Sequence, residues 1–182
     1  MRDTLEELDY WVLSEVIDAA GWVPQHRERV YIAGFDRRQF PMIPQFYFPS
    51  APAGRPTLGS ILEPSPDAKY TLSEHLWGYL QAYAEKHRAK GNGFGFGLAD
   101  PRGISRTLSA RYHKDGAEIL IAQGGGRPPR RLTPGECARL MGFDITQAKQ
   151  IVVSDTQAYR QFGNAVVPKV IEAIGREMVE FL

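Results

Sequence analysis

The first 35 residues alternate short apolar and polar runs. This pattern predicts a helix over residues 4–8, an extended segment over 10–13 and a further short element over 15–20 that ends at Gly21. Residues 30–35 form a short apolar run with β-branched and aromatic positions, which is typical of a buried strand. Because both alternating sets of positions are apolar, we expect this strand to lie in a sheet covered on both faces.

Residues 36–69 contain seven prolines and no helix or strand period. Prolines at this density break regular elements and favour loops that run over a surface. We therefore predict a connector, and we expect three aromatic residues to anchor it to the core: Phe46, Tyr47 and Phe48.

A helix is predicted to begin at Thr71, because Glu74 three residues later completes a capping box. Gly91 is expected to end it. Its apolar positions follow the 3.6-residue period of one buried face: Leu72, Leu76, Tyr79, Leu80 and Tyr83. Cations that suit the negative end of the helix dipole fill its last turn: Lys86, His87, Arg88 and Lys90.

Glycine and aromatic residues alternate over residues 91–97. Glycine permits close approach to the backbone, and a phenylalanine ring offers a flat face on which a base can stack. The same pattern is also found in an edge loop packed on a core. Both interpretations stay open on the sequence alone.

Residues 106–112 and 117–123 are strand-like, and the turn Lys114-Asp115-Gly116 between them predicts a hairpin. The ribbon carries cations and hydroxyls, and a two-stranded ribbon fits the DNA major groove. A plain surface hairpin is the alternative. Glycines and prolines over 124–129 mark a boundary after it.

Three helices are predicted after this boundary. The first has Thr133 and Glu136 as its capping box, Pro134 at its first position and Gly142 as its end. The second spans about 154–163, with Ser154 and Gln157 at its start.

The third predicted helix runs from about Pro168 to the end of the chain. Its expected core face comprises Val170, Ile171, Ile174, Met178 and Val179. Asn164 lies between the last two helices, where its side chain either turns toward a ligand or caps a helix.

The 182 residues, 43% of them hydrophobic, are enough to bury the core of one domain, with or without a second lobe. No apolar run approaches a membrane span and the first residues are too acidic for a secretory signal, so we expect no membrane partner and a cytoplasmic location. The single cysteine, Cys137, excludes an internal disulfide framework. With four scattered histidines it gives no metal-ligand spacing, so we expect no metal.

Positive charge is concentrated in the middle of the chain. Residues 1–85 carry a net charge of −5, residues 86–131 carry +7 and residues 132–182 carry −1. A localised positive surface favours a polyanion such as nucleic acid through counterion release. The alternative is an ordinary basic face in contact with solvent.

Arg27 and Arg29 lie two residues apart where the chain enters the strand at 30–35. In an extended conformation both project to one face. Two permanently charged guanidinium groups there suit an anionic or carbonyl-bearing ligand. The alternative is an ion pair with Glu28 or another acidic neighbour.

Three blocks of sequence occur in an order and spacing that resemble one family. Residues 25–29 read Gln-His-Arg-Glu-Arg, residues 131–143 contain Thr-Pro-Gly-Glu-Cys, and residues 158–167 contain Phe-Gly-Asn-Ala-Val-Val. They are similar to the Gln-x-Arg-x-Arg block and to the ninth and tenth blocks of the cytosine-5 DNA methyltransferases. Residues 86–95 and 106–112 resemble the target-recognition domain of the Dcm-like group, which reads CC-containing sites such as CCWGG.

The resemblance implies roles for residues in these blocks. Arg29 would support the O2 side of a cytosine flipped out of double-stranded DNA, with Gln25 and Arg27 beside it, which favours function over an ion pair for the arginines. The methyl donor is S-adenosylmethionine, and its methionine end would be lined by Asn164, Ala165 and Val166. Candidates for DNA contact are Lys86, Arg88, Lys90, Arg106, Thr107, Ser109, Arg111 and Lys114.

The matched blocks belong to the carboxy-terminal half of the family. That family's glycine-rich donor loop, cysteine nucleophile after a proline and Glu-Asn-Val acid have no counterpart in this sequence. Cys137 lies in a predicted capped helix of the ninth block, so we do not expect it to be the nucleophile. Gly135 stands where many relatives carry arginine, which weakens an ion pair of the fold, and Ala165 stands where some carry serine.

We therefore expect an α/β fold, with a partial Rossmann-like methyltransferase sheet completed by a partner half and a small mixed target-recognition lobe. The expected parts are residues 1–35 in the sheet, 36–69 as connector, 70–144 as recognition lobe and 145–182 as a helical return. The chain would be inactive alone and would need an amino-terminal half or subunit, and its exposed edge also allows self-association. The alternatives are a stand-alone DNA-binding module or degenerate remnant, and an RNA-binding or structural α/β module if the block matches are coincidental.

Overall fold

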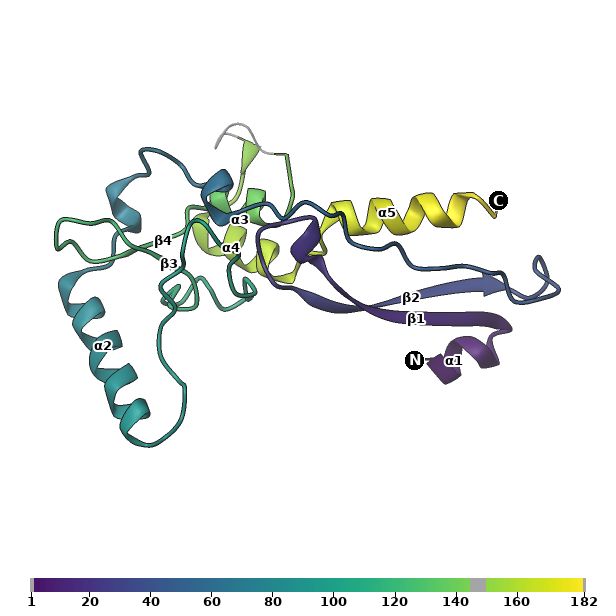
Figure 1. Ribbon diagram of the computed structural model, residues 1–182, viewed down its shortest axis with the longest axis horizontal. Coiled ribbons are helices and arrows are strands. Elements are labelled where there is room, and N and C mark those ends of the chain that lie inside the picture. Colours follow the sequence, from purple (N-terminus) through teal and green to yellow (C-terminus); the bar gives the residue numbers. More distant parts are fainter. Residues whose placement is uncertain (1, 145–149, 182) are drawn as a thin grey trace.

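The computed structural model describes residues 2–144 and 150–181 and shows an elongated molecule (Figure 1). A long hairpin and the carboxy-terminal helix form one end. A mixed α/β body lies next to them, and a single helix projects from the far side of that body. None of the helices in the described ranges is both long and apolar enough to span a bilayer.

The hairpin consists of β1 (Tyr10–Asp18) and β2 (Glu28–Asp36), which pair antiparallel from Tyr10 opposite Asp36 to Asp18 opposite Glu28. It follows the short helix α1 (Arg2–Glu7). The predicted segments 10–13 and 15–20 are therefore one strand that continues into η1 (Ala19–Gly21). Asp18 caps η1 by accepting a hydrogen bond from the Ala20 N–H.

The hairpin is covered on one face only, so the prediction of a strand buried on both faces is wrong. Tyr31, Ala33 and Phe35 point into the core, where the Phe35 ring lies 5.6 Å from that of Phe46. The alternate residues Val30 and Ile32 are 64% and 39% exposed. Because the buried and the exposed positions of β2 are both apolar, the sequence does not show the alternation of apolar and polar residues that is typical of a half-buried strand.

The connector carries η2 (Leu58–Ile61) and η3 (Ala68–Tyr70) and otherwise has no regular structure. Phe46 is buried and packs 4.9 Å from Phe48, as an anchor should. Tyr47 is 75% exposed, so its predicted anchoring role is wrong. Backbone alternation turns it to the opposite side from its two neighbours.

Helix α2 (Glu74–Ala89) is the projecting helix in Figure 1. Its cap is Ser73, whose side chain accepts a hydrogen bond from the Leu76 N–H, and not Thr71 as predicted. Gly91 follows with a φ of 73°, a conformation that ends helices. The predicted buried face is wrong for Tyr79 and Tyr83, which are 58% and 37% exposed. The one buried residue of the helix is Leu80, which packs in a cluster with Leu72 and Leu120.

The predicted hairpin over 106–112 and 117–123 does not form. Residues 106–109 are irregular, 110–113 form turns, and the only strand of the region, β3 (Leu120–Ile121), pairs with β4 (Arg130–Arg131). Tyr112 explains the difference: it is fully buried, its hydroxyl donates to the Ile119 carbonyl at 2.7 Å and accepts from the Leu132 N–H at 2.8 Å. These bonds hold the segment as a loop.

The last three helices are α3 (Pro134–Leu140), α4 (Asp155–Asn164) and α5 (Pro168–Val179). The capping box of Thr133 and Glu136 and the cap of α4 by Ser154 are confirmed. Helix α5 runs beside the hairpin (Figure 1). The core face of α5 is narrower than predicted, because Ile171 and Val179 are 44% and 64% exposed. The predicted boundary at residue 145 lies outside the described residues.

Candidate functional site

The segment that precedes β2 is joined directly to the irregular segment 105–109. His26 N–H donates to the Ser105 carbonyl at 3.0 Å, and Ser105 N–H donates to the Pro24 carbonyl at 2.8 Å. Thr107 donates its hydroxyl to the His26 carbonyl. These contacts across some eighty residues of sequence place the Gln-x-Arg-x-Arg block beside the candidate DNA-contacting residues.

Gln25 is fully buried and uses both ends of its side-chain amide. Nε2 donates to the Leu140 carbonyl at 2.8 Å and lies 3.2 Å from Met141 Sδ, while Oε1 accepts from the Leu108 N–H at 3.1 Å. The side chain therefore fixes the backbone of Leu108 against the end of α3. It has no polar atom left for a ligand.

Arg27 is 2% exposed, and within the described structure its two Nη atoms donate to backbone carbonyls while Nε has no hydrogen-bond partner. Nη1 binds Leu108 O at 2.9 Å, and Nη2 binds Gly163 O at 2.9 Å and Ala165 O at 2.7 Å. Burial lowers the pKa of this guanidinium, and the nearby charge of Arg29 lowers it further, although an arginine stays charged.

Arg29 is exposed, and its Nη1 donates to the Glu28 carbonyl at 2.6 Å. Neither it nor Arg27 forms an ion pair with a carboxylate within the described ranges, so the ion-pair alternative has no support there. The two arginines also lie in different environments. Arg29 alone of the three block residues offers a charged group to a ligand.

Asn164 and its neighbours form the second candidate region. Asn164 is the last residue of α4 and is exposed, and its side chain makes no hydrogen bond within the described part of the chain. It does not cap α5, whose cap position is Val167. Asn164 and Ala165 line an open polar hollow of about 610 Å³ together with Gln157, Arg160 and Gln161. Val166 is 52% exposed beside them.

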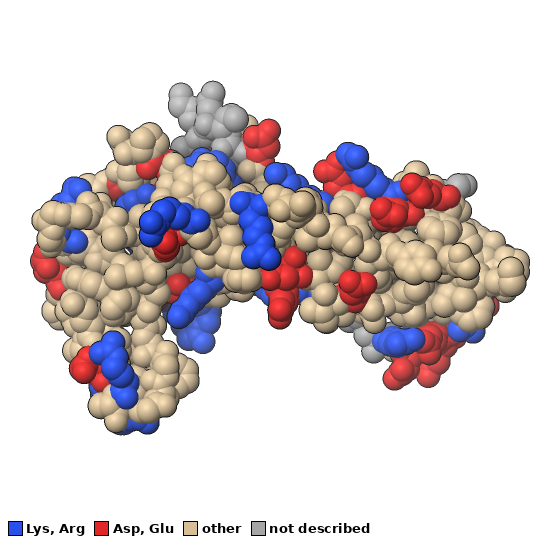
Figure 2. All heavy atoms as spheres, in the orientation of Figure 1, with Lys and Arg blue, Asp and Glu red and all other residues tan. Residues whose placement is uncertain are grey.

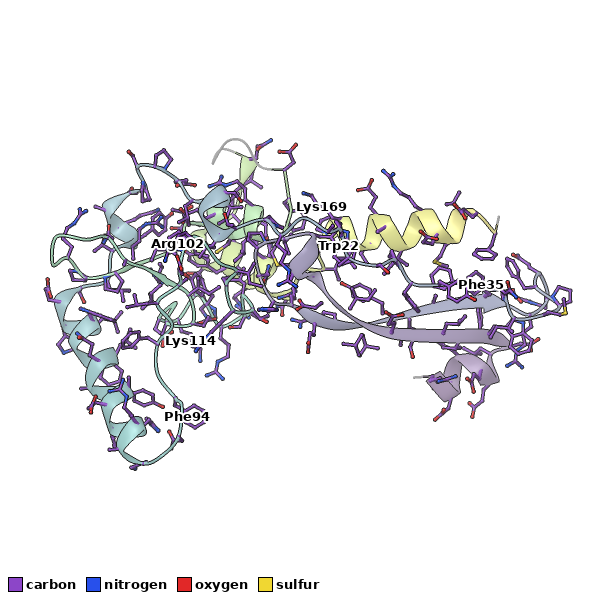
Figure 3. The ribbon with its side chains drawn as sticks, in the orientation of Figure 1. Trp22, Phe35, Phe94, Arg102, Lys114 and Lys169 are labelled. Atoms are coloured by element: carbon purple, nitrogen blue, oxygen red, sulfur yellow. The ribbon has the colours of Figure 1, made fainter. Side chains whose placement is uncertain are left out.

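Three of the predicted DNA-contacting cations lie together. Arg106, Arg111 and Lys114 line a hollow of about 460 Å³ between the body and the loop that follows α2. Two acidic residues, Asp115 and Glu118, also line it. In Figure 2 lysine and arginine side chains border the hollow beside the projecting helix, and Figure 3 shows Lys114 between the body and that loop.

The two hydroxyls predicted for DNA contact also lie there but are engaged within the chain. Thr107 binds the His26 carbonyl, and Ser109 donates to Glu118 Oε1 at 2.6 Å. Both residues line the hollow. Their internal bonds fix the shape of the segment that carries the cations.

Lys86, Arg88 and Lys90 lie apart from this hollow, at the outer end of α2. All three are exposed, and Arg88 is paired with Glu85 at 2.5 Å. The sequence grouped eight residues as one contact surface. The structure brings five of them to the hollow and leaves three on the projecting helix.

Phe94 is a residue that the site prediction missed. The alternating glycine-aromatic run divides its two rings: Phe96 packs 4.7 Å from Trp77, whereas Phe94 is 65% exposed and lines the hollow opposite the cations. Within the described part of the chain its ring contact is with His87, at 5.4 Å. Figure 3 shows Phe94 on the loop that follows α2. The signal was present in the sequence, but periodicity could not say which ring faces out.

Cys137 is fully buried within α3. Burial raises the pKa of its thiol well above the ordinary value, so the thiol stays protonated and unreactive. No cluster of histidine, cysteine and acidic residues that could hold a metal ion occurs in residues 2–144 and 150–181.

At Gly135, where an ion pair was expected to be weakened, the neighbouring carboxylate of Glu63 instead binds Arg139 at 3.0 Å and the Thr133 hydroxyl at 2.9 Å.

The sequence matches the family described as C-5 cytosine-specific DNA methylase over residues 1–180. It is 46% identical to a DNA-cytosine methyltransferase of Escherichia coli K12, over 97% of this chain and 44% of that protein. It is 48% identical to the Type II methyltransferase M.NlaX of Neisseria lactamica, over 96% of this chain and 54% of that protein. It is 45% identical to the Type II methyltransferase M.SsoII of Shigella sonnei, over 100% of this chain and 48% of that protein. The chain thus spans about half the length of the curated relatives it matches.

Solved structures share the fold at low sequence identity. Spodoptera frugiperda DNMT2 matches with a TM-score of 0.74 and 19% identity, over 97% of this chain and 60% of that one. Entamoeba histolytica methyltransferase EhMeth matches with a TM-score of 0.72 and 17% identity, over 98% of this chain and 56% of that one. The predicted α/β class is confirmed, and the small sheets fit part of a Rossmann-like methyltransferase domain.

Proposed function

Because the chain belongs to the C-5 cytosine-specific DNA methylase family, we propose that it is the target-recognition and partial catalytic portion of an enzyme that methylates cytosine C5 in double-stranded DNA. One observation carries the proposal. The buried side chains of Gln25 and Arg27 join the cation-lined hollow, the exposed Arg29 and the Asn164 region into one unit.

The hollow suits a DNA duplex. Arg106, Arg111 and Lys114 supply charge for phosphates and donors for base edges, and Phe94 supplies an aromatic face on the opposite wall. Arginine binds O6 and N7 of guanine in a bidentate manner, which is the chemistry needed for a site rich in G·C pairs. A CC-containing site such as CCWGG is the proposed target.

Methyl transfer to C5 needs a thiolate that adds at C6 of a flipped cytosine, and an acid near N3. Arg29 would bind the O2 side of that base, since its guanidinium is exposed and free of carboxylates in the described structure. Cys137 is unsuited to attack because it is buried and protonated. The nucleophile and the acid would therefore come from an amino-terminal half of the enzyme.

The Asn164 region fits the methionine end of S-adenosylmethionine, which supplies the methyl group when bound. The free amide of Asn164 can both donate to a carboxylate and accept from an ammonium group. Val166 adds an exposed apolar surface, and Ala165 is small enough to leave room beside the polar hollow. The remainder of the donor pocket would lie in the amino-terminal half.

The uncovered face of the hairpin is the proposed contact for that half. Val16 and Val30 are paired across the strands and are 60% and 64% exposed, and Ile32 extends the apolar surface. Both edges of this two-stranded sheet are unpaired in the described structure. The relatives are about twice as long as this chain.

The decisive experiment measures transfer of labelled methyl groups from S-adenosylmethionine to duplexes carrying CCWGG. The chain alone should transfer none, and the chain mixed with an amino-terminal half that carries the Pro-Cys block should methylate the inner cytosine. Val30→Asp should abolish this complementation, whereas the matched control Val152→Asp, at a valine that is 90% exposed outside the hairpin, should leave it intact. Robust transfer by the chain alone would contradict the proposal that the nucleophile is missing.

A stand-alone DNA-binding module is the second candidate. It is favoured by the fact that the cation-lined hollow is built entirely within this chain. Copurification separates the two candidates: a polypeptide with a Pro-Cys block and a Glu-Asn-Val block should accompany the chain if it is half of an enzyme, and should be absent if it acts alone.

A further inference from the structure

Arg27 connects two segments that the proposed function assigns to different ligands. Leu108 belongs to the segment between Thr107 and Ser109, on the DNA side, and Gly163 and Ala165 flank Asn164, on the donor side. The guanidinium binds carbonyls of both segments at 2.7–2.9 Å. The inference below rests on the proposed function, because it concerns how those two sites communicate.

The two segments are also in direct backbone contact. A Cβ atom added at Gly163 would collide with the backbone of Ser109 and Ala110. Glycine therefore lets the end of α4 lie against the recognition segment without an intervening side chain. A shift of either backbone would be transmitted to the other, since close-packed atoms leave no space to absorb it.

Because Arg27 is charged and buried, this contact is stable only while its carbonyl acceptors stay in place. Its side chain is almost fully buried and has no carboxylate partner among the described residues, so its hydrogen bonds go to three carbonyl oxygens. A buried charge that loses one of its partners is strongly destabilised. The planar guanidinium also fixes the directions of its bonds. The position of Leu108 thereby restricts the positions of Gly163 and Ala165.

We propose that Arg27 is a positioning residue that couples DNA binding at segment 107–109 to the conformation of the donor segment 163–166. Duplex bound at the hollow would order the recognition segment and hold the Leu108 carbonyl in place. Through Arg27, the carbonyls of Gly163 and Ala165 would then be held as well. The amide of Asn164 would be presented to the donor in one conformation. Arg27 itself touches neither ligand.

Amide hydrogen exchange on the full chain tests this coupling. A short duplex with one CCWGG site is added, and exchange is followed in peptides that cover residues 163–167. In the wild-type chain the duplex should slow exchange there by about tenfold, the size of a typical coupling between two sites. In Arg27→Met the slowing should fall below about twofold, although the cations of the hollow still bind the duplex.

Two further variants keep the test independent of folding. Gly163→Ala retains Arg27 but forces the two backbones apart, and should also reduce the slowing. Arg27→Lys can reach only part of the carbonyl set and should give an intermediate value. Arg38→Met removes an exposed guanidinium, paired only with Asp36, and should behave as wild type. Circular dichroism identifies any variant that has unfolded. If Arg27→Met is unfolded, the slowing of exchange in Arg27→Lys and Gly163→Ala decides the test.

Unchanged slowing in Arg27→Met or in Gly163→Ala would overturn the proposal, as would normal duplex binding without slowing in the wild-type chain. Failure of the wild-type chain to bind any duplex is a different outcome. It would refute the proposed DNA-binding function itself, and the coupling with it.

Discussion

Replacement of Glu136 by glutamine tests how the region around α3 is held together. The carboxylate is fully buried and each oxygen accepts two hydrogen bonds. Oε1 accepts from the Glu63 N–H at 2.7 Å and Arg130 Nη2 at 2.9 Å, and Oε2 accepts from Arg130 Nη1 at 2.8 Å and the Thr133 N–H at 2.8 Å. In Glu136→Gln one oxygen becomes an NH₂ group, so two donors lose their acceptor whichever way the amide points.

The expected loss of stability follows from the burial of the pair. Arg130 has a side-chain exposure of 6% and would remain charged without its counter-ion. Removal of one partner of a buried pair costs about 3–5 kcal/mol. A protein of this size loses about 2–4 °C of melting temperature for each kcal/mol, so the midpoint should fall by roughly 6–20 °C.

Thermal melting followed by circular dichroism measures this change. The control is Glu85→Gln, which removes an exposed partner of Arg88 and should leave the midpoint nearly unchanged. The double replacement Arg130→Met with Glu136→Gln should recover part of the loss, because it removes the uncompensated charge and keeps an amide oxygen as acceptor for one backbone N–H. A fall of less than about 2 °C in Glu136→Gln would refute the reasoning.

Three other predictions concern single side chains. Phe94→Ala should weaken duplex binding by about tenfold in fluorescence anisotropy and leave the melting temperature unchanged, because stacking of one base contributes about 1–3 kcal/mol. The control Phe96→Ala should mainly lower the melting temperature. Equal effects of the two replacements on duplex binding would contradict the assignment of Phe94 to the hollow. Lys114→Gln should reduce the slope of log affinity against log salt concentration by about 1, and an unchanged slope would mean that it contacts no phosphate. Cys137 should resist iodoacetamide at mildly alkaline pH until the chain is unfolded in urea, because its raised pKa withholds the thiolate; rapid labelling of the native chain would contradict this.

The caps of α3 and α4 could be predicted from the sequence because their contacts are local, whereas the cap of α2 is Ser73 and not the predicted Thr71. Thr133 and Glu136 are three residues apart, and so are Ser154 and Gln157, so the residues that bond are visible in one short window. The hairpin over 106–123 failed for the opposite reason. Strand propensity was outweighed by bonds from Gln25, Arg27 and Tyr112 to distant backbone groups, which no local pattern encodes.

The candidate site also depends on contacts between residues that are far apart in sequence. Spacing placed Arg27 and Arg29 on one face of a strand, but β2 begins at Glu28, and Arg27 lies before it. Its acceptors are 81, 136 and 138 residues away in sequence, so their convergence could not be read from residues 25–29. Resemblance to a family pointed to this block, but only the structure distinguishes the buried Arg27 from the exposed Arg29.

The two ends of the molecule differ in how completely they are packed. In the mixed α/β body the buried polar groups of Glu136, Tyr112 and Arg130 are hydrogen-bonded within the chain. The hairpin has one packed face and one apolar face in solvent, and two-stranded ribbons are marginal on their own. Arg27 lies where these ends meet. An amino-terminal half that covers the hairpin would therefore stabilise the strand that follows Arg27, and through its carbonyl contacts the recognition segment as well.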